Sequence, residues 1–381
     1  MSEKVEFFNH GELGLIVMES AKEIGEKINR NIALLRGEEG ANYIIPMTET
    51  RFQNGEGKVR IDSTVRGKDI FIISDVGNYS CTYEIYGHVN HIGPDEHFQN
   101  IKRVLSAIGG KANRVTVLMP LLYSSRQHKR HGRESLDCAM SLRELEALGV
   151  NTILTFDAHD PTIHNAIPVA SFENVFPTYS IIKEFIKREG VKKMTENMVV
   201  ISPDVGAMER AVYYATVLGH DVGVFYKRRD LDNVVDGKSQ VVMHEYIGKP
   251  LDGKNVLIID DMIASGGSII EVIERLSQYD IKDVYSFVTF PLFTKGVAAF
   301  DKLYEEGKLK KLYSTNLTYV PEEIVNRPWF EQVDLSKYIA KLINTLNHDP
   351  SISGLLDAQL RTKDMVQKAI RAEEQKKADN K

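Results

Sequence analysis

The sequence predicts an α/β protein with two doubly wound parallel-sheet domains. Short apolar runs rich in β-branched residues, such as residues 69–74 and 256–259, are typical of strands buried on both faces of a parallel sheet. Such runs alternate with segments of helical spacing in both halves of the chain, which indicates repeated strand–helix–strand units. The length of 381 residues and the hydrophobic content of 43% are sufficient for two sizeable cores.

The first half of the chain predicts one domain over residues 1–171. Residues 13–34 carry apolar side chains at helical spacing and predict an amphipathic helix. Residues 58–64 alternate like an exposed strand, and residues 77–96 show no sustained period, so that we expect a long loop there. Further strands are expected at residues 69–74, 114–119 and 151–156, and helices at residues 101–108 and 137–148.

The second half predicts a similar domain over residues 172–357, whose last helices can pack back on the first domain. Residues 231–240 are polar and predict a loop. Strands are expected at residues 198–202, 221–226, 256–259 and 284–289, and helices at residues 178–188, 206–218, 266–278, 294–306 and 335–346. The charge-rich residues 358–381 predict a solvated helix that frays and has no chemical role.

Composition and charge argue against several classes of function. The net charge of −5 gives no electrostatic reason to expect nucleic acid or an acidic membrane as a partner. No apolar run approaches the roughly 20 residues of a membrane span, and the N-terminus lacks the layout of a signal peptide. Cys81 and Cys138 are too few and too isolated for a disulfide framework or a zinc site. We therefore expect a soluble cytoplasmic protein.

A string with the chemistry of a phosphate site follows the apolar run 256–259, where we expect the strand to end. A strand, a small-residue turn and a helix N-terminus together present free backbone N–H groups at the positive end of a helix dipole. The string also supplies two carboxylates, which can hold ribose hydroxyls or a hydrated cation. Its residues are Asp260, Asp261, Ser265, Gly266, Gly267 and Ser268. The structural alternative is a turn in which Asp and Ser cap the helix; we favour the phosphate site.

Polar strings also follow other predicted strands, at the edge where open α/β sheets bind their ligands. Residues 123–133 are rich in Arg and Lys within a chain of net negative charge, which favours polyphosphate binding over a merely solvated loop. Asp157 and His159 follow one strand, and Asp204 follows another. A lone histidine more often has a structural role, so the case for a ligand-binding role depends on these residues occurring together. The sequence contains no Walker-type or Rossmann-type glycine motif that would bind phosphate instead.

Residues 260–268 resemble the phosphoribosyl-diphosphate motif of the phosphoribosyltransferase fold, with Ala264 where Asp or Thr is usual. From about Arg51 to Leu356 the chain is similar to the ribose-phosphate diphosphokinases (phosphoribosyl pyrophosphate synthetases). The resemblance implies two domains of the phosphoribosyltransferase type and a transferase of nucleotide biosynthesis. That family uses Mg²⁺ and transfers the diphosphoryl group of ATP to the 1-hydroxyl of ribose 5-phosphate, giving 5-phosphoribosyl 1-diphosphate and AMP.

The resemblance also implies which residues bind the nucleotide and the metal. The ATP-binding set would be Phe52, Asn54, Glu56, Arg126, Gln127 and His159. The residues that would hold the ATP-bound Mg²⁺ are Asp157, His159 and Asp204. Arg210 stands at the family's Arg position after Asp204. Asn54 and His128 depart from the family pattern, which has Asp at both positions.

Catalysis and sugar binding are implied for the second half of the chain. Lys227 and Arg229 match the catalytic Lys-x-Arg of the family. The ribose 5-phosphate set would be Asp260, Asp261, Ala264, Ser265, Gly266, Gly267 and Ser268. In the family, the adenine-binding string at residues 51–56 reaches the site from a neighbouring subunit. We therefore expect a closed, dimer-based homo-oligomer, with a hexamer as one arrangement.

Two alternatives stay open. A phosphoribosyltransferase, which consumes the diphosphate, would keep residues 260–268 but does not need the strings at 51–56, 157–159 and 227–229. A non-catalytic regulatory homologue that associates with a true synthetase is expected to lose its cationic residues. The cationic and metal-binding positions are all occupied here, by Arg126, His159, Lys227 and Arg229. We therefore favour the synthetase.

Overall fold

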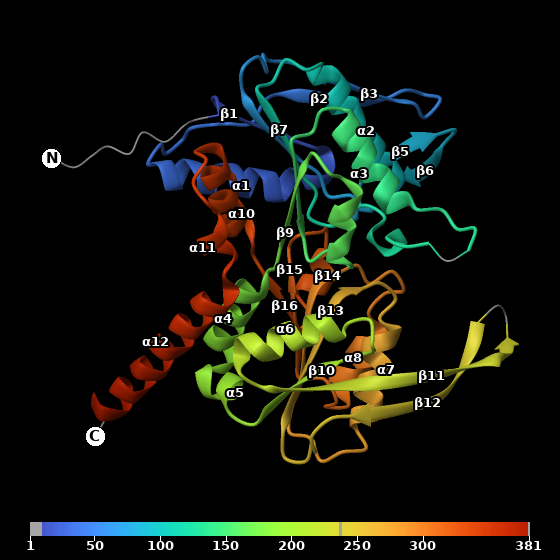
Figure 1. The fold of residues 1–381 in the computed structure, drawn as a ribbon, viewed down its shortest axis with the longest axis vertical. Coiled ribbons are helices and arrows are strands. Elements are labelled where there is room, and N and C mark those ends of the chain that lie inside the picture. The colour runs from blue at the N-terminus through green and yellow to red at the C-terminus, as the bar shows by residue number, and fades with distance from the viewer. Residues whose placement is uncertain (1–9, 131, 236–237, 380–381) are drawn as a thin grey trace. The chain divides into compact units, whose positions relative to one another are not determined.

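The computed structural model describes residues 10–130, 132–235 and 238–379; the side chains of residues 227–235, 238–244, 374 and 376–379 lie outside that description. The chain divides into two units (Figure 1). The first contains Met1–Phe176, Asn316–Tyr319 and Asp334–Leu356, and the second contains Pro177–Thr315, Val320–Val333 and Asp357–Lys381. Each unit has its own sheet of parallel strands flanked by helices, which confirms the predicted fold class.

The main sheet of the first unit is parallel, with five strands in the order β1-β4-β7-β8-β9. The strands are β1 (Leu13–Val17), β4 (Asp69–Ile73), β7 (Arg114–Leu118), β8 (Thr152–Phe156) and β9 (Ser171–Val175). Two hairpins accompany it, formed by β2 (Met47–Arg51) with β3 (Gly57–Ile61) and by β5 (Thr82–Ile85) with β6 (His88–His91). The helices are α1 (Lys22–Arg36), α2 (Pro94–Ile108), α3 (Asp137–Ala147), α10 (Ser336–Asn347) and α11 (Ser353–Leu356), with 3-10 turns η1 (Glu19–Ala21), η2 (Ser125–Gln127) and η3 (Pro161–Ala166).

The single helix expected over residues 13–34 is wrong in its first part. Leu13–Val17 form β1, which pairs in parallel with β4, and α1 begins only at Lys22. The apolar residues of β1 are consecutive, a pattern that fits both a strand buried on both faces and the first turn of an amphipathic helix.

The long loop expected over residues 77–96 is also wrong, because β5 and β6 pair there as a hairpin. Its turn residues Tyr86 and Gly87 have φ of 52° and 73°, the positive values that a two-residue type I′ hairpin turn requires. The flanking strands are short and largely exposed, so no apolar alternation indicates them in the sequence.

A buried ion pair ties α10 to the sheet of the first unit. The Arg114 guanidinium donates to both oxygens of Asp69, from Nε to Oδ1 at 2.9 Å and from Nη2 to Oδ2 at 2.7 Å. Asp69 is fully buried, and Asn347 of α10 donates from Nδ2 to its Oδ2 at 2.9 Å. These donors satisfy the buried carboxylate and join β4, β7 and α10.

The second unit contains a seven-stranded sheet in the order β12-β11-β10-β13-β14-β15-β16, in which only the edge pair β11–β12 is antiparallel. The strands are β10 (Met198–Ser202), β11 (Asp221–Val235), β12 (Lys238–Ile247), β13 (Asn255–Ile263), β14 (Val284–Pro291), β15 (Lys311–Thr315) and β16 (Phe330–Val333). The helices are α4 (Thr178–Glu189), α5 (Val191–Thr195), α6 (Met208–Leu218), α7 (Gly267–Leu276), α8 (Ala298–Glu305), α9 (Glu322–Val325) and α12 (Ala358–Asp379).

Two strands of the second unit run further than predicted. The loop expected at residues 231–240 is largely replaced by the long ribbon of β11 and β12, which extends away from the rest of the sheet in Figure 1. β13 continues past Ile259 to Ile263, so Asp260 and Asp261 lie within this strand rather than after it. The apolar run is interrupted by the two carboxylates but resumes at Met262, and the ladder with β14 continues across them.

The charged C-terminal segment is a helix, as expected, but it is not solvated on all sides. α12 packs against α4, α5 and α6 of the second unit. Ala358 and Thr362 are buried, and the Arg361 guanidinium lies 4.0 Å from the centre of the Tyr179 ring. Among the described residues, no helix combines the length and apolarity that crossing a membrane requires.

Candidate active site

The turn between β13 and α7 has a backbone that only glycine fits. Gly266, which immediately precedes α7, has φ of +82°, and an ideal Cβ built on it would lie 2.8 Å from Cε2 of Phe300. Phe300 is itself fully buried and stacks on Trp329 with ring centroids 5.5 Å apart, so it has little room to move. Thr294 also contacts this turn, because its N–H donates to the Ala264 carbonyl oxygen at 2.8 Å.

This geometry favours one of the two interpretations of the turn. Because the capping position of α7 is occupied by Gly266, no side chain at that position satisfies the first N–H groups of the helix. Ser265 and Gly267 are exposed, and Ser268 is half-buried. An uncapped, accessible helix N-terminus with hydroxyls beside it favours the anion site over a turn closed by its own side chains.

The two carboxylates of β13 form a tightly coupled pair. The Asp261 N–H donates to Oδ1 of Asp260 at 2.9 Å, and Asp261 is 2% exposed. Burial raises the pKa of Asp260 well above its usual range, and the Asp261 carboxylate raises it further, against the opposing effect of the Arg210 charge. A ligand that donates hydrogen bonds to both carboxylates would reduce the repulsion between them. Two neighbouring sugar hydroxyls could donate such hydrogen bonds.

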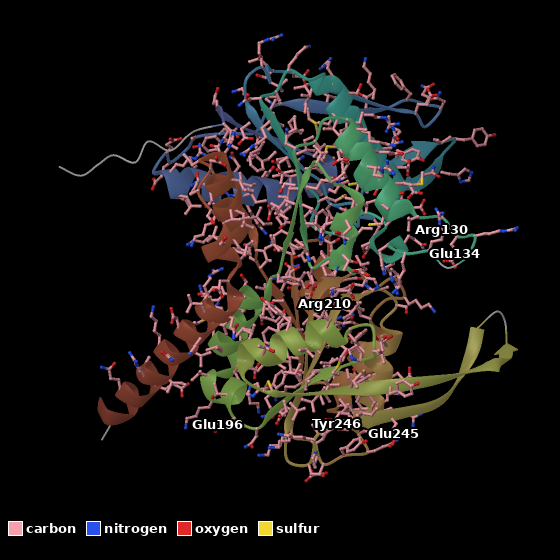
Figure 2. The ribbon with its side chains drawn as sticks, viewed as in Figure 1. Arg130, Glu134, Glu196, Arg210, Glu245 and Tyr246 are labelled. Carbon is pink, nitrogen blue, oxygen red and sulfur yellow. The ribbon has the colours of Figure 1, made fainter. Side chains whose placement is uncertain are left out.

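Arg210 lies in the first turn of α6, in the segment that follows β10 (Figure 2). The same segment holds Asp204, whose Oδ1 accepts from the Ala207 N–H at 3.1 Å. The Ser202 hydroxyl donates to the Asp204 carbonyl oxygen at 2.6 Å. One carboxylate oxygen of Asp204 therefore shapes the turn into α6, a structural role that accompanies any role in binding a metal.

Lys227 and Arg229 lie in β11, with their side chains outside the described residues. The backbone of Lys227 pairs with His244 of β12, and the register shifts between Arg228 and Arg229. Strict alternation of side chains holds only in a regular strand. Residues two apart in a regular strand point to the same side of the sheet, and for Lys227 and Arg229 this shared direction stays a prediction.

In the first unit, the turn after β8 carries Asp157 and His159. Asp157 is buried and has φ of +42°, an uncommon backbone conformation for a residue other than glycine. Its N–H donates to the Val175 carbonyl oxygen at 2.9 Å, and the Ala158 N–H donates to Oδ1 of Asn174 at 2.9 Å. Strained backbone of this kind is concentrated at functional sites, where the surrounding structure holds it in place.

The basic string begins beside this turn. His128 Nε2 lies 3.2 Å from Oδ2 of Asp160, and the ring centroids of His128 and His159 are 5.4 Å apart. Arg126 and Gln127 lie in η2 and are exposed. Exposed Arg130 and Glu134 follow on the protruding loop (Figure 2). The structure thus brings the start of the basic string together with the Asp157–His159 turn, as the strand-end argument predicts.

The tip of the β2–β3 hairpin carries Phe52, Asn54 and Glu56. Phe52 is 49% exposed, which is unusual for a large aromatic residue on an otherwise polar tip. Asn54 Nδ2 donates to Oε2 of Glu56 at 2.9 Å, so these two side chains form one hydrogen-bonded unit. The tip packs on the β5–β6 hairpin through Arg51, whose guanidinium lies 4.7 Å from the Tyr83 ring centre. An exposed ring beside a carboxylate and an amide is suited to a flat heteroaromatic base.

Among the described residues, no three His, Cys, Asp or Glu side chains are grouped in a way that could hold a metal ion. Mg²⁺ commonly takes only one or two carboxylates from a protein and completes its shell with substrate phosphates and water. A cation that arrives with a polyphosphate would therefore need few ligands from the protein.

Comparison with known proteins identifies the family. Residues 13–149 match the N-terminal domain of ribose phosphate pyrophosphokinase, and residues 177–316 match the phosphoribosyl transferase domain. The chain is 30% identical over 314 residues to a ribose-phosphate pyrophosphokinase of Haemophilus ducreyi, a match that covers 82% of this chain and 90% of that protein. The chain belongs to the ribose-phosphate pyrophosphokinase family.

Other matches cover nearly the whole of the pyrophosphokinases concerned. Ribose-phosphate pyrophosphokinase 1 of Streptococcus pneumoniae is 27% identical over 352 residues, covering 91% of this chain and 98% of that protein. The crystal structure of a phosphoribosylpyrophosphate synthetase from Mycobacterium smegmatis has the same fold, with a TM-score of 0.72 and 21% identity over 89% of this chain and all of that one. The protein is thus an enzyme of the ribose-phosphate pyrophosphokinase type.

The sequence did not reveal two residues that shape the candidate site of this pyrophosphokinase-type enzyme. Asn174 lies in β9, a strand that the sequence did not indicate, and contacts the Asp157–His159 turn only because β9 pairs with β8. Asp160 was not singled out, although it accepts hydrogen bonds from Thr162 and pairs with His128. A signal for Asp160 was present, since Asp before Pro161 is typical of the residue that caps a helical turn.

Proposed function

We propose that the protein catalyses Mg²⁺-dependent transfer of the diphosphoryl group of ATP to the 1-hydroxyl of ribose 5-phosphate, giving 5-phosphoribosyl 1-diphosphate and AMP in the cytoplasm. The observation that carries the proposal is the uncapped N-terminus of α7 behind Gly266, next to half-buried Asp260 and buried Asp261, in a member of this family. The helix N-terminus is suited to the phosphate group of a sugar phosphate, and the two carboxylates are suited to its hydroxyl groups.

The sugar phosphate would bind to the second unit. The N–H groups at the start of α7 and the hydroxyls of Ser265 and Ser268 are the donors for the 5-phosphate. Asp260 and Asp261 would accept hydrogen bonds from the 2- and 3-hydroxyls, so that the 1-hydroxyl is the group left to react. Ala264 contributes only backbone, and we expect it to weaken but not abolish phosphate binding.

The nucleotide would use residues of the first unit. Phe52, with Asn54 and Glu56, would contact the adenine base, and the exposed cations of residues 126–133 would neutralise its phosphates. In the family resemblance the base-binding tip serves a neighbouring subunit, so we propose a closed homo-oligomer built from dimers. A fully active monomer in sedimentation experiments would contradict this arrangement.

Mg²⁺ would accompany the nucleotide. By the family resemblance, Asp157, His159 and Asp204 are the residues that would hold it, and substrate phosphates and water would supply most of its ligands. When bound, the ion would neutralise charge on the polyphosphate and orient it.

The chemical step is an in-line displacement at the β-phosphorus of ATP. The 1-hydroxyl oxygen forms a bond to this phosphorus, the bond to the α,β-bridging oxygen breaks, and AMP leaves with the electron pair while the hydroxyl proton passes to solvent. Negative charge grows on the bridging oxygen, which Lys227, Arg229 and Arg126 would stabilise. A loose transition state needs little deprotonation of the nucleophile, which is consistent with the lack of a dedicated base among the assigned residues.

One assay tests the proposal. Purified protein is incubated with ATP, ribose 5-phosphate and Mg²⁺, and AMP is quantified by chromatography, with each component omitted in turn. We expect AMP only when all three are present. AMP that forms without ribose 5-phosphate would contradict the proposal. No AMP from a folded protein that binds both substrates would favour a regulatory homologue.

A further inference from the structure

The turn after β8 is held in an uncommon conformation by the neighbouring strand. Asp157 has φ of +42° and is buried, so its backbone cannot relax toward solvent. The β8–β9 ladder pairs Thr155 with Asn174 and Phe156 with Val175, which brings the end of β9 alongside the turn. A left-handed residue other than glycine persists only where surrounding contacts determine it.

Two hydrogen bonds from β9 hold the turn, and they differ in kind. The Asp157 N–H donates to the main-chain carbonyl of Val175 at 2.9 Å, a bond available whatever side chain stands there. The Ala158 N–H donates instead to Oδ1 of Asn174 at 2.9 Å, a bond that depends on the side chain. An apolar residue at position 174 would leave the Ala158 N–H without this acceptor.

Asn174 is otherwise poorly suited to its surroundings. Phe172, two residues earlier in β9 and so on the same face, packs against the hydrophobic core of the first unit. Nδ2 of Asn174 is buried and, within the part of the chain that the structure describes, has no hydrogen-bond partner. A buried donor without a partner destabilises the fold. We therefore explain the presence of an amide at position 174 by the hydrogen bond that its Oδ1 accepts from the Ala158 N–H.

We propose that Asn174 is a positioning residue for the reaction: its Oδ1 fixes the Ala158 N–H and thereby the backbone that presents Asp157 and His159 to the nucleotide and its cation. The inference rests on the proposed function, because it assigns Asn174 a role toward the ligand that Asp157 and His159 would hold. Asn174 itself does not touch the reacting atoms.

Asn151 provides a matched control at the other end of the same strand. It directly precedes β8, and its Oδ1 accepts from the Val115 N–H at 2.8 Å. Asn151→Ala therefore removes the same kind of bond, from a side-chain amide oxygen to a backbone N–H, without touching the turn. A general loss of stability in the first unit would affect both variants, whereas a positioning effect is expected only in Asn174→Ala.

The experiment measures binding of α,β-methylene-ATP with Mg²⁺ and, separately, of ribose 5-phosphate by calorimetry. For Asn174→Ala we expect the Kd of the nucleotide analogue to rise about tenfold, which is the effect expected when one well-placed hydrogen bond is lost. The Kd of ribose 5-phosphate should be unchanged. Deuterium uptake by a peptide that covers residues 157–160 should be faster than in the wild type. Asn151→Ala should change both Kd values less than about twofold.

Asn174→Asp keeps the acceptor oxygen and the shape of the side chain, and it keeps the test decisive if the alanine variant does not fold. We expect it to hold the nucleotide affinity within about threefold of the wild type. A folded Asn174→Ala with wild-type nucleotide affinity, or a folded Asn174→Asp whose nucleotide Kd rises about tenfold or more, would overturn the inference alone. A wild type that binds ribose 5-phosphate but no nucleotide would overturn the proposed function and this inference with it.

Discussion

An ideal Cβ on Gly266 would lie 2.8 Å from Cε2 of Phe300, a contact that real side chains almost never make. The backbone at Gly266 is also left-handed, with φ of +82°. Steric crowding and conformation therefore both reserve this position for glycine, and the N–H groups at the start of α7 lie where a phosphate can approach them.

We expect Gly266→Ala to raise the KM for ribose 5-phosphate at least tenfold and to lower the free energy of unfolding by about 1–3 kcal/mol. Gly296→Ala is the matched control, because Gly296 has φ of +74° but nothing lies within 4 Å of an added Cβ. The control variant should also be destabilised by an alanine at positive φ, but its KM for ribose 5-phosphate should stay normal. Equal KM values for the two variants in steady-state kinetics would show that the close packing at Gly266 does not position the phosphate.

Asp260→Asn should separate stability from function. Because the pKa of Asp260 is raised in the folded protein, folding favours the protonated carboxyl, and its contribution to stability is lost as the pH rises through the raised pKa. The amide cannot ionise, so we expect Tm at pH 8 to rise by roughly 2–4 °C, with a smaller gain near pH 4. The kcat/KM for ribose 5-phosphate should fall roughly 10- to 100-fold, because a charged acceptor is lost. Calorimetric scans of the variant and the wild type at both pH values test this account. It would be refuted if the gain in Tm over the wild type were smaller at pH 8 than at pH 4.

Arg114→Leu should be among the most damaging changes outside the site. It leaves the fully buried Asp69 carboxylate with Asn347 as a remaining side-chain donor, and we expect a loss of about 3–5 kcal/mol. Arg60→Ala breaks the exposed pair with Asp62 and should leave the free energy of unfolding nearly unchanged. Urea unfolding monitored by circular dichroism gives both values; similar losses would mean that the Arg114–Asp69 pair has no special role in stability.

Lys227→Ala tests the chemical step. If the lysine stabilises charge that appears mainly in the transition state, kcat should fall on the order of 10²–10³-fold while the KM values for ATP and ribose 5-phosphate change much less. Exposed Lys249, which pairs with Asp221 at 2.8 Å near the start of the same ribbon, is the control and should leave kcat unchanged as alanine. Near-normal turnover of a folded Lys227→Ala protein would remove this residue from the mechanism.

The fold class could be predicted because the strands that build both sheets are buried on both faces and are therefore continuous apolar runs. β4 and β10 are examples in which every residue is buried. β1 was mistaken for part of a helix because its apolar residues also fit a helical stripe. β9 was not predicted because it is only partly buried. The β5–β6 hairpin was not predicted because its strands are short and largely exposed, and its turn residues Tyr86 and Gly87 are not the usual Asn-Gly or Asp-Gly pair.

The candidate site was predictable only as far as topology determines it. In each parallel sheet the strands end at one edge, so a polar residue soon after a strand could be picked out from the sequence, as Asp157 after β8 of the first sheet and Asp204 after β10 of the second. Their supporting partners could not, because the Asn174 contact depends on the register of β9 and the His128–Asp160 pair joins two separate loops. The buried state of Asp261 was also hidden, since it depends on β13 running past Ile259.

Phosphorus NMR of the complete reaction tests the central proposal most directly, because it identifies which group is transferred and to which atom. With ATP, ribose 5-phosphate and Mg²⁺, we predict equimolar AMP and a sugar that carries a diphosphate coupled to its C1 proton and an intact 5-phosphate. ADP with a singly phosphorylated 1-position would mean transfer of one phosphoryl group instead. Consumption of added 5-phosphoribosyl 1-diphosphate with a free base, without AMP formed from ATP, would mean a phosphoribosyltransferase and would contradict the account.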